Sequence, residues 1–243
     1  MIMKPEEDAY GQELLAYFNG KEIIEIVERD DGFISTGLEV SYYFSQFEDW
    51  PFHEQEAITF AKDKVLDIGC GAGRHSLYLQ EKGYDVVGID QSPLAIKVCK
   101  LRGMKKAQVM AIEEVDFTEE TFNTILMLGS NFGLFGSFNK ARQLLKRFHQ
   151  LTSSDALIIT ESNDVYQTEN PDHLAYQEAN RKKGRMSGQL RIRVRFGKYA
   201  TPWFDYLIVS KDEMQDILEG TGWKIGKFID SEVAKYIAII EKT

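Results

Sequence analysis

The sequence predicts an α/β fold in which helices cover both faces of a doubly wound, mostly parallel sheet. Three observations lead to this expectation. Between residues 64 and 162, short apolar runs alternate with helix-like segments; glycines close several connections; and the last two apolar runs lie too near each other for a helical crossover. Alternating strands and helices form parallel sheets, whereas strands joined by a short turn pair antiparallel.

The predicted elements follow one another regularly along the chain. The first strand is the apolar run KVLDIG, and a glycine-rich turn leads from it into a helix. Ser92 and Pro93 stand where a helix favours a hydroxyl cap and a proline. The pattern predicts strands at 64–69, 84–90, 107–112, 121–128 and 155–162, helices at 74–83, 93–103 and 138–151, and an antiparallel edge pair at 223–230 and 233–240.

Two segments lie outside this alternation. Residues 1–60 are expected to form a helix at about 5–18, a hairpin that turns at Asp31-Gly32, and an aromatic-rich stretch. Residues 163–210 are expected to insert a second hairpin, in which strand 190–196 alternates apolar side chains with arginines and pairs with residues 203–210. We therefore predict an N-terminal extension (1–60) that acts as a lid, and a main domain (61–243) that carries the substrate-side insertion.

Composition and charge narrow the classes of partner. The 243 residues include 38 acidic and 29 basic side chains, and the net charge of −9 disfavours general binding to nucleic acids. The balance reverses only between residues 181 and 198, where eight bases stand without an acid. No apolar run approaches the ~20 residues of a membrane-spanning helix. With two cysteines and no secretory leader, we expect a cytoplasmic protein without a membrane partner.

The run VLDIGCGAGR at 65–74 carries the clearest chemical signal. Its glycines allow a sharp turn between strand and helix and let a ligand lie against the main chain. Asp90 ends the next strand, where a carboxylate can accept hydrogen bonds from both ribose hydroxyls. A nicotinamide dinucleotide site would have its third glycine where Arg74 stands, which disfavours a dehydrogenase. The alternative is that the glycines only close a tight strand–helix connection.

The run VLDIGCGAG, followed by VVGIDQSPLAI, resembles the class I S-adenosylmethionine (SAM)-dependent methyltransferases. The similarity covers residues 55–162 closely and the last two strands more loosely. In that family the sheet is Rossmann-like and seven-stranded, with its last strand inserted antiparallel, which agrees with the predicted edge pair. The resemblance implies an enzyme that transfers a methyl group from SAM.

The resemblance also implies which residues bind the cofactor. Asp67 and the glycine loop would lie against the methionine part and the adenosine, with Asp90 at the ribose. The family often has an acid after the third strand, and here Ile112 and Glu113 are the candidates for that adenine contact. Cys70 is expected to be a small buried residue rather than a nucleophile. The predicted cofactor residues are Asp67, Gly69, Cys70, Gly71, Gly73, Arg74, Asp90, Gln91, Ile112, Glu113, Leu128 and Gly129.

The sequence gives fewer signals for the residues that would contact the methyl acceptor. Because SAM brings its own electrophile, the protein needs no metal or nucleophile, and the four scattered histidines show no metal-ligand spacing. Arg74 and His75 either approach the carboxylate of SAM or stay exposed at a helix start. His53 is either a base or a surface or packing residue, and no catalytic base is assigned. The candidates near the acceptor are Asn131, Tyr10, Tyr43, Trp50, Arg193 and Arg195.

Three functions are compatible with these signals. The first is methyl transfer to a small molecule, with an anionic acceptor gripped by the arginines of strand 190–196 as one version. The second is methyl transfer to RNA or protein, with the basic insertion as a docking patch. The third is SAM binding without transfer. The Asn/Asp-Pro-Pro-aromatic tetrad of amino-methylating nucleic-acid enzymes is absent, which favours the small molecule.

Overall fold

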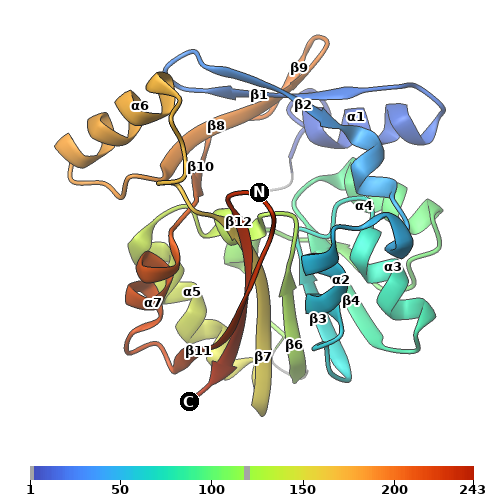
Figure 1. Ribbon diagram of the computed structural model, residues 1–243. Helices are drawn as coiled ribbons and strands as arrows, with labels where there is room; N and C mark the ends of the chain where they lie inside the picture. Colours follow the sequence, from blue (N-terminus) through green and yellow to red (C-terminus); the bar gives the residue numbers. More distant parts are fainter. Residues whose placement is uncertain (1–2, 118–120) are drawn as a thin grey trace. The chain divides into compact units, whose positions relative to one another are not determined.

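The computed structural model describes residues 3–117 and 121–243 and confirms the predicted α/β architecture (Figure 1). The first two residues of the predicted extension and residues 118–120 of the predicted main domain lie outside this description. The helices are α1 (Ala9–Phe18), α2 (Phe52–Ile58), α3 (Arg74–Glu81), α4 (Pro93–Leu101), α5 (Phe138–Gln150), α6 (Pro171–Lys182) and α7 (Lys211–Leu218). Short 3-10 turns are η1 (Val40–Phe44), η2 (Phe47–Asp49), η3 (Ile112–Glu114) and η4 (Asn131–Phe135).

Seven strands form the main sheet, in the order β11-β12-β7-β6-β3-β4-β5. They are β3 (Lys64–Ile68), β4 (Asp85–Asp90), β5 (Ala107–Val109), β6 (Phe122–Met127), β7 (Thr152–Asn163), β11 (Trp223–Asp230) and β12 (Lys235–Lys242). The pairs β4–β5 and β6–β7 are parallel, whereas β12 runs antiparallel to both β7 and β11. The predicted antiparallel insertion near the edge of the sheet is therefore confirmed.

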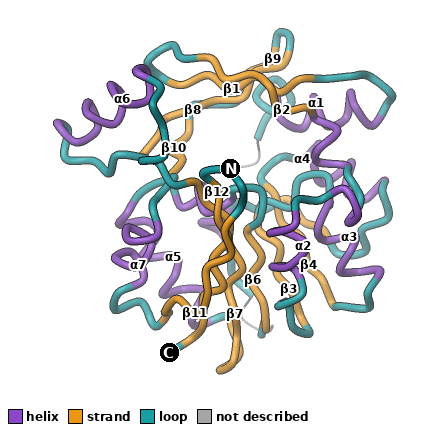
Figure 2. Tube along the Cα trace, viewed as in Figure 1, coloured by secondary structure: helices purple, strands orange, loops and turns teal. Residues whose placement is uncertain are grey.

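A second sheet has the order β10-β8-β1-β2, with the short strand β9 paired to β8. Its strands are β1 (Ile24–Arg29), β2 (Ile34–Glu39), β8 (Gln189–Phe196), β9 (Tyr199–Ala200) and β10 (Phe204–Leu207), coloured orange with the other strands in Figure 2. The hairpins predicted in both outlying segments are present. The antiparallel pairing of β1 with β8, which joins the two segments in one sheet, was not predicted.

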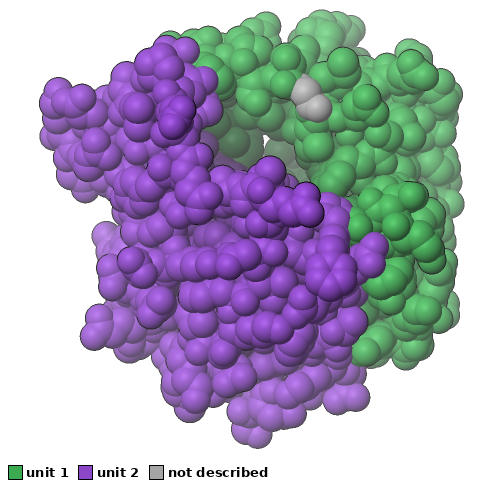
Figure 3. All heavy atoms as spheres, in the orientation of Figure 1, with its two compact units in different colours: residues 1–50, 66–115, 191–204 green, residues 51–65, 116–190, 205–243 purple. Residues whose placement is uncertain are grey.

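The chain forms two compact units, coloured separately in Figure 3. The first comprises residues 1–50, 66–115 and 191–204. In it α3 packs on β4, α4 packs on β4 and β5, and α1 packs on α4. The contact between α1 and α4 is apolar, because Leu14 and Val98 belong to one fully buried cluster. This cluster attaches the N-terminal helix to the part of the fold that carries the glycine turn.

The second unit comprises residues 51–65, 116–190 and 205–243. Helices α5 and α7 pack against each other, α7 also contacts β11, and α2 contacts β11 and β12. Phe122, Phe135 and Phe148 are completely buried in its core. Trp223, at the start of β11, donates its indole N–H to the carbonyl oxygen of Leu145 at 2.9 Å and so ties the edge strand to α5.

Several elements differ from the prediction. The first helix starts at Ala9 rather than near residue 5, because the side chain of Asp8 caps it. The strand expected at 107–112 ends at Val109, and the 3-10 turn η3 follows it. The insertion 163–210 also contains α6, whose cap Asn170 and first-turn Pro171 were not recognised as a start signal. Within the described residues, no helix combines the length and the apolar character needed to cross a membrane.

Candidate cofactor and acceptor sites

The glycine turn between β3 and α3 lies in the first unit. Gly71 and Gly73 have left-handed backbone angles, with φ of 52° and 83°, which an L side chain adopts only under strain. A Cβ atom added at Gly71 would lie 2.6 Å from the hydroxyl oxygen of Tyr10. A larger residue at position 71 would therefore collide with Tyr10, so the turn requires glycine there.

Asp90, the last residue of β4, holds this turn in place. Its Oδ2 accepts the N–H of Gly71 at 3.0 Å, and its Oδ1 accepts the N–H of Ser92 at 2.8 Å. Burial raises the pKa of Asp90 to about 6, against the opposing effect of these two main-chain hydrogen bonds. Each carboxylate oxygen keeps a second lone pair. The carboxylate can therefore still accept hydrogen bonds from sugar hydroxyls.

Two further residues of the predicted cofactor set are buried around the turn. Asp67 in β3 accepts a hydrogen bond from the hydroxyl of Ser76 at 2.6 Å, and burial raises its pKa. Cys70 is a buried free thiol, and a hydrogen bond with Cys99 together with burial raises its pKa well above the ordinary value. A thiol of this kind is unreactive, which agrees with the packing role expected for Cys70.

Arg74 and His75 are both buried, so the alternative that they are exposed at the start of α3 is wrong. The Nε of Arg74 donates to the hydroxyl of Ser45 at 2.8 Å. Its guanidinium lies 4.1 Å from the ring centroid of Tyr42 and 4.8 Å from that of Trp50. Arg74 therefore attaches the aromatic segment of the N-terminal part to α3, a role that sequence spacing did not indicate.

The predicted acceptor-side tyrosines lie together in the first unit. Tyr10 and Tyr43 meet edge to face, with ring centroids 5.5 Å apart. The hydroxyl of Tyr43 donates to Glu25 at 2.9 Å. The neighbouring Glu13 on α1 is a fully buried carboxyl, and burial together with the charge of Glu25 raises its pKa. This pair of acids, of which Glu13 is buried and Glu25 half-buried, was not singled out in the sequence.

Arg193 and Arg195 on β8 share one carboxylate. Arg193 Nε lies 2.8 Å and Arg195 Nη1 3.1 Å from the same oxygen of Glu28 on β1. The guanidinium of Arg193 also lies 4.5 Å from the ring centroid of Trp203. These contacts hold the arginines within the second sheet, so an anionic ligand would have to compete with Glu28 for them.

The remaining predicted residues fall in both units. In the first unit Ile112 is buried in η3, whereas Glu113 and Gln91 are exposed. In the second unit Leu128, Gly129 and Asn131 follow β6, with Leu128 buried and the other two half-buried.

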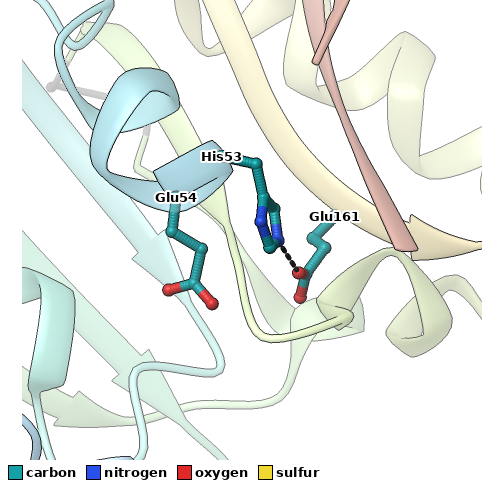
Figure 4. A group of neighbouring side chains, drawn as sticks. All are labelled: His53, Glu54 and Glu161. Atoms are coloured by element: carbon teal, nitrogen blue, oxygen red, sulfur yellow. Dashed lines mark hydrogen bonds and ion pairs between the residues drawn. The ribbon is translucent and has the colours of Figure 1, made fainter. Parts of the chain in front are cut away.

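A buried polar cluster in the second unit was not predicted as a group (Figure 4). His53 Nε2 lies 3.2 Å from Glu161 Oε1, and both side chains are buried. Glu54 adds a second buried carboxylate, and the three groups each place an atom within 4.8 Å of the others. His53 and Glu161 are 108 positions apart in the chain, so no spacing rule could have joined them.

Comparison with known proteins supplies the deciding observation. A family model described as a methyltransferase domain matches residues 65–155. A solved SAM-dependent methyltransferase from Bacteroides fragilis, in complex with S-adenosyl-L-homocysteine, is 26% identical in sequence, with a TM-score of 0.85 over 100% of this chain and 98% of that one. Residues 65–155 thus form the core of a class I SAM-dependent methyltransferase domain. SAM is accordingly its cofactor.

Other relatives of this methyltransferase share a smaller part of it. A glycine/sarcosine N-methyltransferase from Aphanothece halophytica is 26% identical over 107 residues, which cover 42% of this chain and 40% of the relative. The chain spans less than half the length of the first curated relatives that it matches. A SAM-dependent methyltransferase from Methanosarcina mazei, 17% identical with a TM-score of 0.61 over 79% of this chain and 97% of that one, shares the fold.

The described residues of this methyltransferase fit its cofactor. The turn between β3 and α3 carries no side chain at Gly71 and Gly73, and Asp90 offers a buried acceptor for the ribose. SAM, when bound, supplies an electrophilic methyl group on a sulfonium sulfur. The protein then has to orient the acceptor, exclude water and, for an acceptor that loses a proton, receive that proton.

Proposed function

We propose that this methyltransferase transfers the methyl group of SAM to a small-molecule acceptor. The observation that supports the proposal most directly is the pairing of the left-handed turn at Gly71 with the buried carboxylate of Asp90. In this assignment the turn and Asp67 hold the methionine part and the adenosine, and Asp90 holds the ribose. The other predicted cofactor residues keep the roles that the resemblance implies for them.

The choice of a small molecule is supported by the relatives. Three of the curated proteins are named as glycine/sarcosine N-methyltransferases. The net charge of −9 also disfavours a nucleic-acid acceptor. We further propose that residues 1–60 act as a lid and that the insertion 163–210 contributes to the acceptor side. The pairing of β1 with β8 supports a common role for the two segments. A cytoplasmic location remains a prediction, supported by two free thiols.

Calorimetric titration tests the cofactor assignment. The protein is titrated separately with SAM, S-adenosyl-L-homocysteine and NAD. We expect both adenosyl ligands to bind and NAD to give no heat of binding. Substitution of Asp90 by Ala should weaken the binding of both adenosyl ligands by about 10- to 100-fold, as expected for loss of a hydrogen bond to a charged group. Tight NAD binding would contradict the assignment.

Label transfer tests the reaction. The protein is incubated with SAM carrying an isotopically labelled methyl group and, in separate samples, a deproteinised metabolite extract, total RNA and a protein fraction. We expect mass spectrometry to find the label in a compound of the metabolite extract. Label in RNA or protein alone would contradict a small-molecule acceptor. SAM binding without label in any fraction would identify a binding module instead.

An acidic acceptor is a second candidate, favoured by the eight bases between residues 181 and 198. Such an acceptor would compete with Glu28 for Arg193 and Arg195. We expect the double substitution of these arginines by Gln to raise the KM for an acidic acceptor without changing the Kd for SAM. Unchanged acceptor kinetics would remove the arginines from the acceptor site.

A further inference from the structure

The second unit holds a histidine whose orientation is set by a chain of hydrogen bonds. His53 stands in the first turn of α2, and Glu161 lies near the carboxyl end of β7. Their side chains meet at 3.2 Å through Nε2 of the histidine, and Glu161 is completely buried (Figure 4). In the tautomer with its proton on Nε2, the histidine donates this hydrogen bond to the carboxylate of Glu161.

The position of Glu161 is itself fixed from its other oxygen. Oε2 accepts the main-chain N–H of Ser130 at 2.5 Å and its hydroxyl at 3.3 Å. Ser130 has a left-handed backbone, with φ of 63°, an uncommon state for a residue other than glycine. Tyr206 donates its hydroxyl to the carbonyl oxygen of Ser130 at 2.5 Å, and Asn163 donates to the Ser130 hydroxyl at 3.3 Å. Strained backbone held by several partners is typical of functional sites.

The second ring nitrogen of His53, Nδ1, takes no part in the hydrogen bond to Glu161. Nδ1 lies on the opposite side of the ring from the hydrogen bond to Glu161 (Figure 4). Among the residues that the structure describes, none forms a hydrogen bond with this nitrogen. With the proton on Nε2, Nδ1 presents a lone pair and can accept a proton.

The place of this pair in the fold suits an acceptor site. Ser130 follows the carboxyl end of β6, and Glu161 and Asn163 close the neighbouring parallel strand β7. In open α/β sheets, ligands bind at the carboxyl ends of the strands. A histidine oriented by a buried carboxylate is the arrangement that general-base catalysis uses.

On the basis of the proposed function, we infer that His53 is the general base of the reaction and that Glu161 positions it. In this step the N–H or O–H bond of the acceptor breaks, the proton moves to Nδ1 of His53, and the electron pair stays on the heteroatom. That pair then forms a bond to the methyl carbon, while the bond from this carbon to the sulfur breaks and its electrons stay on the sulfur of the departing S-adenosyl-L-homocysteine. The histidine returns its proton to water after the products leave. The substrate class is therefore an amine or hydroxyl compound that must lose a proton.

Nuclear magnetic resonance tests the orientation without any acceptor. The protein labelled with 15N in its four histidines is compared with the H53Q variant, which assigns the signals of His53. We expect the proton on Nε2 and a bare Nδ1, and we expect E161Q to convert His53 to a mixture of both tautomers. A proton on Nδ1 in the wild type would overturn the proposal.

Label transfer from SAM into the deproteinised metabolite extract tests the chemistry. We expect H53Q to lower the initial rate by about 10²- to 10⁴-fold, while the Kd for SAM stays unchanged. Added imidazole should restore part of the rate to H53G, which a purely structural role would not explain. The matched control is H149Q, the same substitution in α5 of the same unit, and it should keep the wild-type rate.

Three results would overturn the inference in distinguishable ways. If the wild type transfers no label, the proposed function and the inference fail together. If H53Q transfers label at the wild-type rate, only the inference fails. If dialysis against EDTA abolishes transfer and zinc restores it, the cluster of His53, Glu54 and Glu161 is a metal site, and the histidine is a ligand rather than a base.

Discussion

Asp90 is the residue at which protonation and cofactor binding are most directly linked. Burial raises its pKa to about 6, so the carboxylate is mostly ionised at neutral pH and mostly protonated at pH 5. The ionised form accepts hydrogen bonds through both oxygens, whereas protonation turns one of them into a donor. A ribose that donates both hydroxyl hydrogens therefore binds the ionised form.

We predict that the affinity for SAM falls as the pH drops below about 6. Because the bound state requires the ionised carboxylate, the Kd should rise by up to about tenfold for each pH unit in that range. Calorimetric titration at several pH values between 5 and 8 measures the slope. D90N binds more weakly but carries no titrating group at this position, so its Kd should stay constant. A wild-type Kd that is constant between pH 5 and 7 would contradict the role of Asp90.

Glu13 on α1 and Glu25 on β1 are a second place where protonation matters to the protein. Burial raises the pKa of Glu13 to about 10, and the neighbouring carboxyl of Glu25 adds to the effect. Burial also raises the pKa of Glu25, although hydrogen bonds with Tyr43 and Glu13 oppose the rise. At neutral pH Glu13 is therefore protonated in the folded state, whereas in the unfolded chain both acids would be ionised.

We predict that E13Q becomes more stabilising, relative to the wild type, as the pH rises. The pKa of Glu13 is higher in the folded protein than in the unfolded chain. Its favourable contribution to the free energy of unfolding is therefore complete below the unfolded value of 4.5 and is lost as the pH rises toward 10. The loss reaches up to about 1.4 kcal/mol per pH unit. Glutamine avoids it, because its amide can donate to Glu25 without titrating. Thermal unfolding between pH 5 and 8.5 measures the difference in Tm, with the exposed E22Q as control. A difference that does not change with pH would contradict the raised pKa of Glu13.

At the scale of elements, the side chain of Asp8 accepts hydrogen bonds at the starts of two helices. Asp8 Oδ1 accepts the N–H of Gly11 at 3.0 Å and so caps α1. The same oxygen accepts the hydroxyl of Ser92 at 2.6 Å, and Oδ2 accepts the N–H of Leu94 at 3.0 Å, at the start of α4. Asp8 therefore attaches the N-terminal helix to the helix that follows Asp90.

We predict that D8A lowers the free energy of unfolding by roughly 2–4 kcal/mol, because it removes a cap and two further hydrogen bonds to a buried carboxylate. Urea unfolding measures the change. Hydrogen exchange should also increase throughout α1. The matched control is S210A, which removes a single cap at the start of α7. If D8A lowers the free energy of unfolding no more than S210A does, the hydrogen bonds from Asp8 to the start of α4 contribute nothing to stability.

At the scale of the whole molecule, strands that are far apart in sequence share a sheet. Val27 of β1 pairs with Ser35 of β2 on one side and with Val194 of β8 on the other. Val194 is buried, and across the same pair of strands Arg193 reaches Glu28. The N-terminal hairpin and the insertion should therefore lose their structure together.

We predict that V194D opens both segments, because it places an unpaired carboxylate in a buried position of the shared sheet. Hydrogen exchange should rise in residues 24–39 and in residues 189–207, whereas β6 and β7 should keep their protection. The conservative V194I variant should behave like the wild type. Increased exchange confined to residues 189–207 would show that the two segments are independent.

The features that the sequence predicted are those encoded by neighbouring residues. The glycine turn, the carboxylate at the end of β4 and the cap at Ser92 each depend on spacings of a few residues. The alternation in residues 190–196 likewise predicted a strand. Its partner β1 could not be predicted, because Val27 and Val194 are brought together only by the register of the folded sheet.

The sequence by itself determined the order of strands and helices, the methyltransferase turn and the antiparallel end of the main sheet, because backbone preferences and apolar periodicity act locally. Tertiary structure alone decided that Arg74 is buried among aromatic rings, that Glu13 meets Glu25, and that His53 meets Glu161. Such contacts depend on which surfaces pack against each other. Packing follows from the shape and burial of whole elements, and it leaves no periodic trace in the chain.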